Sequence, residues 1–188
     1  MKLRIVSGYL KGRYLSLKDR DSDFRPTRER VRESVANILA SRCRDASVAD
    51  VCAGSGAFGF EMLSRGARSC TFIENDRFRV KRLREHAERF DVAAKCEMVQ
   101  GDLRTFLRGC TRSFDIIYFD PPYDDPEFVP LVPELAALLT GTGILIYERR
   151  RRRGRQDMEP LYDTLSHIDK RIYGETEVWL CTRSGSKG

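Results

Sequence analysis

Short apolar runs alternate along this chain with segments of helical or charged character. The five central runs lie at about residues 48–52, 70–74, 97–100, 115–119 and 143–147. This alternation is typical of a parallel β-sheet whose two faces are both covered by helices. Two later runs, near 168–173 and 177–182, predict an antiparallel hairpin that completes the sheet. The expected fold class is therefore α/β.

The beginning of the chain does not follow this alternation. Residues 3–6 and 13–17 flank Gly8 and Gly12, which predicts a short β-hairpin. A helix is expected after Pro26, because Val31, Val35, Ile38 and Leu39 recur at helical spacing. If this apolar stripe is extended toward the start of the helix, Arg28 falls on it and is expected to face a cleft. Glu29 and Glu33 are expected to point away from the cleft.

The net charge of +6 is concentrated in the same amino-terminal region. Residues 1–32 hold ten Lys or Arg against four Asp or Glu, an excess equal to the surplus of the whole chain. A basic arm on a neutral body is typical of proteins that bind nucleic acid. A merely solvated surface is the alternative interpretation.

Length and composition bound the remaining possibilities. At 188 residues one domain is expected, and no apolar run reaches the roughly 18 residues of a membrane span. The start of the chain lacks the apolar core of a signal peptide, so a soluble, cytoplasmic protein is expected. The six cysteines include no Cys-x-x-Cys pair, which predicts reduced thiols and no metal site.

A glycine-rich turn follows the first long strand. Gly54, Gly56 and Gly59 satisfy the G-x-G-x-x-G pattern, in which glycines let a ligand approach the backbone. Glu74 stands 20 residues beyond Gly54, at the end of the next strand, where a carboxylate can accept both hydroxyls of a ribose. These signals predict a nucleoside site and leave a dinucleotide and S-adenosylmethionine both open.

Further acidic residues favour S-adenosylmethionine. Asp50 precedes the glycine turn, where a negative charge suits an ammonium and a sulfonium better than a pyrophosphate. Asp102 can accept from an adenine amine, with Leu103 against the ring. The alternatives are a strand-end cap for Asp50 and helix N-caps for Asp102 and Asp76; for Asp76 the cap is favoured.

The fourth central strand ends in Asp120-Pro121-Pro122-Tyr123. The two prolines fix φ and remove two donors, so the Asp120 carboxylate and the Pro121 carbonyl form a stiff acceptor pair for an exocyclic amine. Tyr123 is expected to stack on the ring that carries the amine. These four residues are the predicted catalytic group, and a simple turn is the alternative.

Together these motifs resemble the class I S-adenosylmethionine-dependent amino-methyltransferases. The amino-terminal blocks make the resemblance narrower and are similar to the RsmD family, the 16S ribosomal RNA guanine-N2 methyltransferases. Those blocks are Arg4-Ile5-Val6-Ser7-Gly8, Lys11-Gly12-Arg13 and Arg25-Pro26-Thr27-x-x-Arg30-Val31-Arg32-Glu33.

The resemblance implies a Rossmann-like fold with a seven-stranded, mostly parallel sheet, an antiparallel last strand and an amino-terminal hairpin. The expected organisation is a basic hairpin over 1–26, a methyltransferase domain over 27–183 and a disordered tail over 184–188. The implied cofactor is S-adenosylmethionine, and the implied partner is 16S rRNA or an assembling 30S subunit. The protein is expected to be a monomer that binds no metal and no membrane. The residues expected to bind the cofactor are Asp50, Ala53, Gly54, Ser55, Gly56, Glu74, Asn75, Asp102 and Leu103. Those expected to bind RNA are Arg4, Lys11, Arg13, Arg25, Arg28, Arg30 and Arg32.

Two departures from the family pattern are present. Cys52 stands where the family usually has an aromatic residue, which should alter packing only. Arg149 to Arg153 follow Glu148 in place of a shorter turn, either to contact phosphates or as a solvated loop.

Other functions stay open at this point. The same fold could methylate adenine N6 or a protein glutamine, each of which presents an amine. A non-catalytic RNA-binding assembly factor is a third possibility, although phosphate binding requires none of Glu74, Asp102 and the Asp120 motif.

Overall fold

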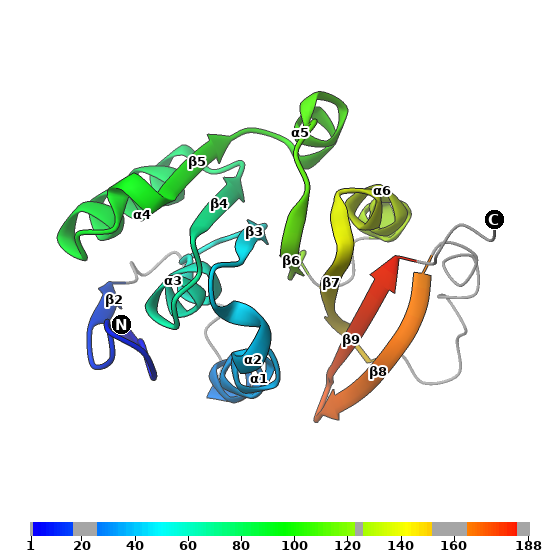
Figure 1. Ribbon diagram of the computed structural model, residues 1–188, viewed down its shortest axis with the longest axis horizontal. Coiled ribbons are helices and arrows are strands. Elements are labelled where there is room, and N and C mark those ends of the chain that lie inside the picture. The colour runs from blue at the N-terminus through cyan, green and yellow to red at the C-terminus, as the bar shows by residue number, and fades with distance from the viewer. Residues whose placement is uncertain (1, 17–25, 123–125, 152–164, 184–188) are drawn as a thin grey trace.

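The computed structural model describes residues 2–16, 26–122, 126–151 and 165–183. Its centre is a seven-stranded sheet with the strand order β5-β4-β3-β6-β7-β9-β8 (Figure 1). The strands are β3 (Ser47–Val51), β4 (Ser69–Glu74), β5 (Cys96–Gln100), β6 (Phe114–Phe119), β7 (Leu139–Arg150), β8 (Leu165–Tyr173) and β9 (Thr176–Arg183). The helices are α1 (Pro26–Ile38), α2 (Ala40–Cys43), α3 (Ala57–Ser64), α4 (Arg77–Arg89), α5 (Leu103–Gly109) and α6 (Val132–Ala137), with short 3-10 turns η1 (Ala93–Lys95) and η2 (Pro126–Leu131).

The strand directions confirm the expected mixed sheet. Strands β3 to β7 pair in parallel, while β9 runs antiparallel to both of its neighbours, β7 and β8. The chain builds outward from β3 in one direction through β4 and β5, and in the other through β6 and β7. This reversal creates a crevice at the carboxyl ends of β3 and β6, where ligands bind in open α/β sheets.

Both faces of the sheet are buried, as the apolar runs predicted. Successive residues of β6 point to opposite sides, with Ile116 in a core shared with α1, α3 and α4, and Ile117 in a core shared with α5 and α6. A strand covered on both faces needs apolar side chains at every position, which explains continuous rather than alternating hydrophobicity. Within the described ranges, no helix is both long and apolar enough to cross a membrane.

The amino-terminal hairpin, β1 (Lys2–Arg4) and β2 (Tyr14–Ser16), packs against α3 and α4. Leu3 and Leu15 point inward and are buried in the same core as α3. Ser64 receives a hydrogen bond from the Leu10 amide at 2.9 Å through Oγ, and one from the Tyr9 amide at 2.9 Å through its carbonyl. The hairpin and the main sheet therefore share one core.

A glycine permits this close docking. Gly8 has a φ of +77°, and an added Cβ would lie 1.8 Å from the carbonyl oxygen of Ser64. No side chain fits at such a distance, so Gly8 is required where the hairpin backbone crosses α3.

The expected boundary at 26/27 falls beside residues 17–25, and the expected tail is 184–188; both segments lie outside the described ranges.

Candidate active site

A cavity of about 330 Å³ opens at the carboxyl ends of the parallel strands. Its walls come from the ends of β3, β4 and β6, from the segments that follow β3 to β6, and from α1, β1 and the last part of β7. Eleven of the residues predicted for the cofactor and catalytic groups line it. These are Asp50, Ala53, Gly54, Ser55, Glu74, Asn75, Asp102, Leu103, Asp120, Pro121 and Pro122. Tyr123, the fourth predicted catalytic residue, lies outside the described residues.

The glycine turn after β3 divides its residues between two tasks. Gly54 lines the cavity with a φ of +55°, and an added Cβ would meet nothing closer than 3.8 Å. Gly56 also has a positive φ, of +73°, but an added Cβ would lie 2.3 Å from Leu83 Cδ2. At Gly59 the added Cβ would lie 2.4 Å from the Phe72 ring. Gly56 and Gly59 therefore serve close packing of α3, and the prediction that Gly56 contacts a cofactor does not fit its place behind the wall.

Glu74 ties the end of β4 to the glycine turn. Its carboxylate is buried and accepts the Gly54 amide at 2.8 Å through Oε2 and the Asp76 amide at 3.0 Å through Oε1. A carboxylate has about four acceptor sites, so two backbone donors leave capacity for further donors. The side chain is thereby held at the cavity wall with acceptor capacity left for a ligand.

Asp50 lies on β3 beneath the same turn and is 2% exposed. Its Oδ2 accepts the amide of Gly59, in the first turn of α3, at 2.9 Å. Burial raises the pKa of Asp50 to about 8, and the nearby Asp120 and Glu74 carboxylates add to the rise. The predicted strand-end cap is thus a cap of the following helix, made by a residue that also lines the cavity.

This pKa predicts how stability depends on pH. An unfolded aspartate ionises near pH 4, whereas Asp50 in the folded chain holds its proton to about pH 8. Folding therefore binds a proton in this window, and the contribution of Asp50 to stability falls as pH rises from 4 to 8. We expect the free energy of unfolding of wild type, measured relative to Asp50→Asn, to drop by an amount on the order of a few kcal/mol across this range.

Urea unfolding at a series of pH values checks this expectation. His86 contributes the opposite slope, because burial lowers its pKa to about 4 and its stabilisation is lost as pH falls from 6.5 toward 4. Both proteins retain His86, so its contribution cancels in the difference. Parallel pH profiles for wild type and Asp50→Asn would contradict the assignment.

Two aspartates begin helices, as the alternative interpretation held. Asp76 accepts the amides of Phe78 and Arg79 at 2.7 and 3.0 Å, which confirms the predicted N-cap of α4. Asp102 accepts the amide of Thr105 at 3.2 Å as the N-cap of α5. Asp102 also lines the cavity beside the buried Leu103, so the cap and a ligand contact are compatible in this residue.

The lining is rich in acidic groups. Among the residues that the structure describes, six carboxyl side chains line the cavity against two guanidinium groups, those of Arg32 and Arg79. The six are Glu29, Asp50, Glu74, Asp102, Asp120 and Glu148. An acidic enclosure attracts a cationic ligand and opposes a pyrophosphate. Within the described ranges, no three His, Cys, Asp or Glu side chains gather closely enough to hold a metal ion.

Sequence reasoning missed several residues of the lining. Glu29 was expected to point away and instead lines the cavity, as does Arg32, which was expected to bind RNA. The Arg32 side chain is 11% exposed, and its Nη2 lies 3.8 Å from Glu29 Oε1. Ala36 is also fully buried, so the inner face of α1 is wider than the predicted stripe.

Two further missed residues form a buried pair. The Tyr118 hydroxyl donates to Glu148 Oε1 at 2.5 Å, and Glu148 is 2% exposed. The Tyr118 ring stacks on Phe58 with 3.9 Å between centroids and 9° between planes. The position of Glu148 in the sequence could have revealed it. Glu148 directly follows its apolar run, just as Asp120 follows the preceding one.

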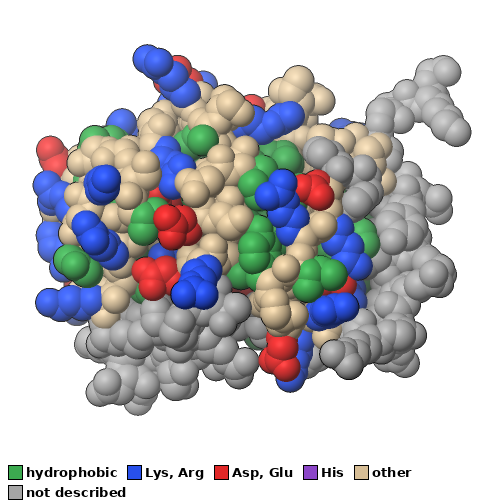
Figure 2. Space-filling view, turned by 90° about the horizontal axis from the view of Figure 1, so that it is seen from below, with side chains coloured by type: hydrophobic (Ala, Val, Ile, Leu, Met, Phe, Trp, Pro, Cys, Tyr) green, Lys and Arg blue, Asp and Glu red, His purple; other side chains and the backbone are tan. Residues whose placement is uncertain are grey.

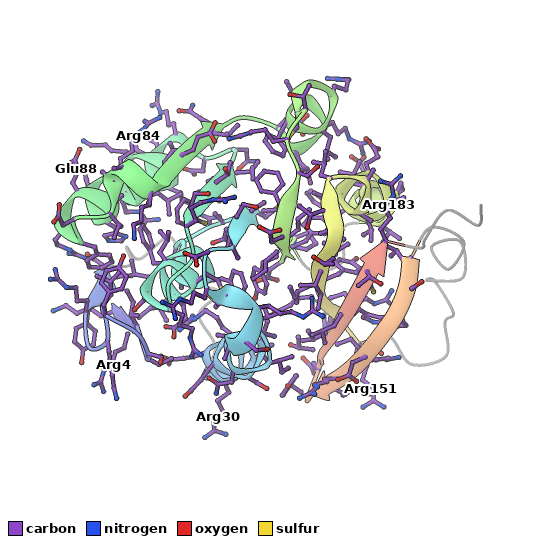
Figure 3. All side chains as sticks on the ribbon, in the orientation of Figure 1. Arg4, Arg30, Arg84, Glu88, Arg151 and Arg183 are labelled. Atoms are coloured by element: carbon purple, nitrogen blue, oxygen red, sulfur yellow. The ribbon has the colours of Figure 1, made fainter. Side chains whose placement is uncertain are left out.

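The remaining predicted RNA-binding residues lie at the surface where they are described. Arg4, Lys11, Arg13 and Arg30 are exposed, and Figure 3 shows Arg4 and Arg30 extending away from the body. Figure 2 shows Lys and Arg side chains spread across the face seen from below, interspersed with acidic and apolar groups. Arg25 and the side chain of Arg28 lie outside the described part.

The arginine run begins inside the sheet. Strand β7 extends to Arg150, beyond the predicted end at about 147, and Arg149 pairs with Glu177 of β9 at 3.3 Å. Arg150 lies 3.8 Å from Glu175. The sequence allowed the arginine run either to contact phosphates or to form a solvated loop. Arg149 does neither, because its side chain is only 10% exposed and is paired within the sheet. Residues 152 and 153 lie outside the described ranges.

The strand order, the reversal at β3 and the crevice define the Rossmann-like fold of the class I methyltransferases. A family model described as Conserved hypothetical protein 95 matches residues 3–182. The chain belongs to this family, the RsmD family, which confirms the resemblance drawn from the amino-terminal blocks.

Similar proteins support this placement. Ribosomal RNA small subunit methyltransferase D of Escherichia coli is 37% identical over 122 residues, which are 65% of this chain and 61% of that protein. The match thus covers less than two thirds of that relative's length. The "Putative rRNA methyltransferase YlbH" of Bacillus subtilis is 26% identical over 97% of this chain and 100% of its own. A solved structure, "Putative methyltransferase yhhF from Escherichia coli", superposes with a TM-score of 0.80 at 29% identity, covering 98% of this chain and 99% of that one.

Proposed function

We propose that this protein transfers a methyl group from S-adenosylmethionine to the exocyclic N2 amine of a guanine in 16S ribosomal RNA. The observation that carries the proposal is the acidic cavity, which joins a nucleoside-binding acid, Glu74, to the Asp120-Pro121-Pro122 segment. The names of the E. coli and B. subtilis relatives agree with an RNA substrate.

The residues present fit the cofactor. Glu74 would hold the ribose hydroxyls, and Asp102 and Leu103 would receive the adenine. Asp50 would place its carboxylate near the ammonium of the methionine moiety; because a cation favours the charged form, binding would release the proton that Asp50 holds below about pH 8. When bound, the cofactor supplies a methyl group on a positively charged sulfur.

Asp120 and the Pro121 carbonyl would accept the two hydrogens of the guanine N2 amine. The nitrogen lone pair of that amine is delocalised into the ring, so orienting it toward the methyl carbon is the main task of the site. The amine nitrogen would form its new bond to the methyl carbon, and the sulfur would leave with the electron pair of the broken S–C bond. The nitrogen becomes acidic only then, and Asp120 receives or relays its proton.

The exposed basic residues of the hairpin and α1 would hold the RNA backbone. Arg4, Lys11, Arg13 and Arg30 lie on the surface, and each phosphate contact adds to the salt dependence of binding. Arg32 belongs to the cavity and not to this surface.

Transfer of radiolabelled methyl groups tests the function directly. The purified protein is incubated with labelled S-adenosylmethionine and, separately, with undermethylated 30S particles, naked 16S RNA, DNA and protein. We expect label on the RNA of the particle or on free 16S RNA, recovered as N2-methylguanosine after digestion. Label in N6-methyladenosine or in protein would replace the proposal with another acceptor, and no label on any substrate would support a binding function alone.

A further inference from the structure

Two carboxylates each follow one member of a register pair on neighbouring strands at the cavity. Phe119 of β6 and Tyr147 of β7 are paired in register, and Asp120 and Glu148 are the next residue of each segment. Adjacent parallel strands lie about 4.8 Å apart, and alternation places both side chains on the face that carries Tyr118 and Ile146. Both residues line the cavity, so the two acids stand side by side at its wall.

Glu148 is held firmly in this position. Its Oε1 accepts the hydroxyl of Tyr118 at 2.5 Å, and Phe58 stacks on the tyrosine ring. Burial raises the pKa of Tyr118 well above 10, and the charges of Glu148 and Asp120 add to the rise, so the hydroxyl keeps its proton and remains a donor. A carboxylate has about four acceptor sites, so an acid that accepts from Tyr118 can also accept an N–H from a ligand in the cavity.

Adjacent carboxylates recognise a base edge with two adjacent donors. Guanine presents N1–H next to its N2 amine, whereas adenine presents an N1 lone pair next to its N6 amine. We propose that Glu148 accepts the N1–H of the guanine whose N2 amine Asp120 holds, and thereby selects guanine over adenine. This inference rests on the proposed function and adds the residue that determines which purine is accepted.

The physical reason for discrimination is repulsion as well as attraction. An adenine in the same pose would direct the N1 lone pair at the Glu148 carboxylate, leaving a buried charge opposite an acceptor. Sites built to bond an N–H or O–H reject analogues that lack it by factors that reach about 10⁴. Protein glutamine, the other amine considered from sequence, has no second donor at this spacing.

Replacement of the target base tests the inference. The guanine that wild type methylates is located by mass spectrometry and replaced by 2,6-diaminopurine in an otherwise identical RNA. This base keeps the C2 amine but has a lone pair at N1. We expect wild type to prefer guanine by at least about 10² in kcat/KM. In Glu148→Gln the amide can donate to that lone pair, so we expect the ratio of the two kcat/KM values to fall at least tenfold, with rising turnover of diaminopurine.

Two controls separate base selection from general damage. Glu29→Gln changes another carboxylate of the same cavity and should leave the ratio at its wild-type value. Tyr118→Phe removes the donor to Glu148 but keeps the acid, so turnover should fall while guanine stays preferred. Titration with S-adenosylhomocysteine should give equal affinity in wild type and Glu148→Gln, which reports that the variant is folded.

The outcomes are distinguishable. The role of Glu148 is overturned if Glu148→Gln keeps the wild-type ratio of kcat/KM for guanine over diaminopurine. It is also overturned if wild type uses both bases equally. In either case the proposed N2 methylation stands. If Glu148→Gln fails to fold, the wild-type preference decides, and equal use of guanine and diaminopurine overturns the inference. Absence of N2 methylation on every RNA overturns the proposed function and this inference together.

Discussion

Replacing Asp120 by alanine is expected to lower turnover on RNA by a factor on the order of 10² to 10³, with little change in cofactor affinity. Asp120 stands at the end of β6 in the cavity wall, beside the rigid Pro121 and Pro122. Its carboxylate is proposed to orient the attacking amine and receive its proton, and both tasks lie in the chemical step. Loss of one preorganised polar group has effects of this size in other enzymes.

Single-turnover kinetics with saturating RNA, together with calorimetry of S-adenosylhomocysteine, measure the two quantities. Asp120→Asn keeps the volume and one accepting oxygen, so an intermediate rate is expected. Glu127→Ala is a suitable control, because Glu127 lies outside the cavity lining and pairs with Arg104 at the surface. Near-normal turnover in Asp120→Ala would remove this residue from the chemistry.

The second large effect is expected at Glu74, in binding rather than in turnover. Its carboxylate holds the amides of Gly54 and Asp76 and is proposed to hold the ribose as well. Hydrogen bonds to charged groups contribute about 1.5 to 3 kcal/mol each. Glu74→Ala should therefore weaken binding of S-adenosylhomocysteine by about 10² or more, since about 1.4 kcal/mol corresponds to a tenfold change.

Calorimetry with S-adenosylhomocysteine and with adenosine tests this prediction, because both ligands carry the ribose. Glu97→Ala provides the matched control, since Glu97 lies on the neighbouring strand β5 and pairs with Arg112 outside the cavity. Unchanged affinity for both ligands in Glu74→Ala would show that the ribose is held elsewhere.

Much of the fold followed from the order of apolar segments. The runs that end near Val51, Glu74, Gln100 and Phe119 are parallel strands of one sheet, as predicted. Parallel strands in one sheet share a carboxyl edge, so acids that follow them must gather there. For this reason the order of residues along the chain was enough to group Asp50, Glu74, Asp102 and Asp120.

The glycine pattern shows where the same reasoning failed. The spacing of Gly54, Gly56 and Gly59 matched a ligand-binding turn, but only Gly54 lines the cavity. Gly56 and Gly59 are needed because α3 lies so close to Leu83 and Phe72. A motif records the absence of a Cβ and does not say whether a ligand or a neighbouring side chain occupies the space.

The sequence by itself determined the order of strands and helices, the position of the glycine turn and the acids at strand ends. These follow from local periodicity and from residues close together in the chain. Only the tertiary structure decided that Glu29 and Arg32 face the cavity, that the hairpin docks on Ser64, and that Glu148 stands beside Asp120. Each of these depends on which distant segments become neighbours, and that is settled by strand order, register and packing across the whole sheet.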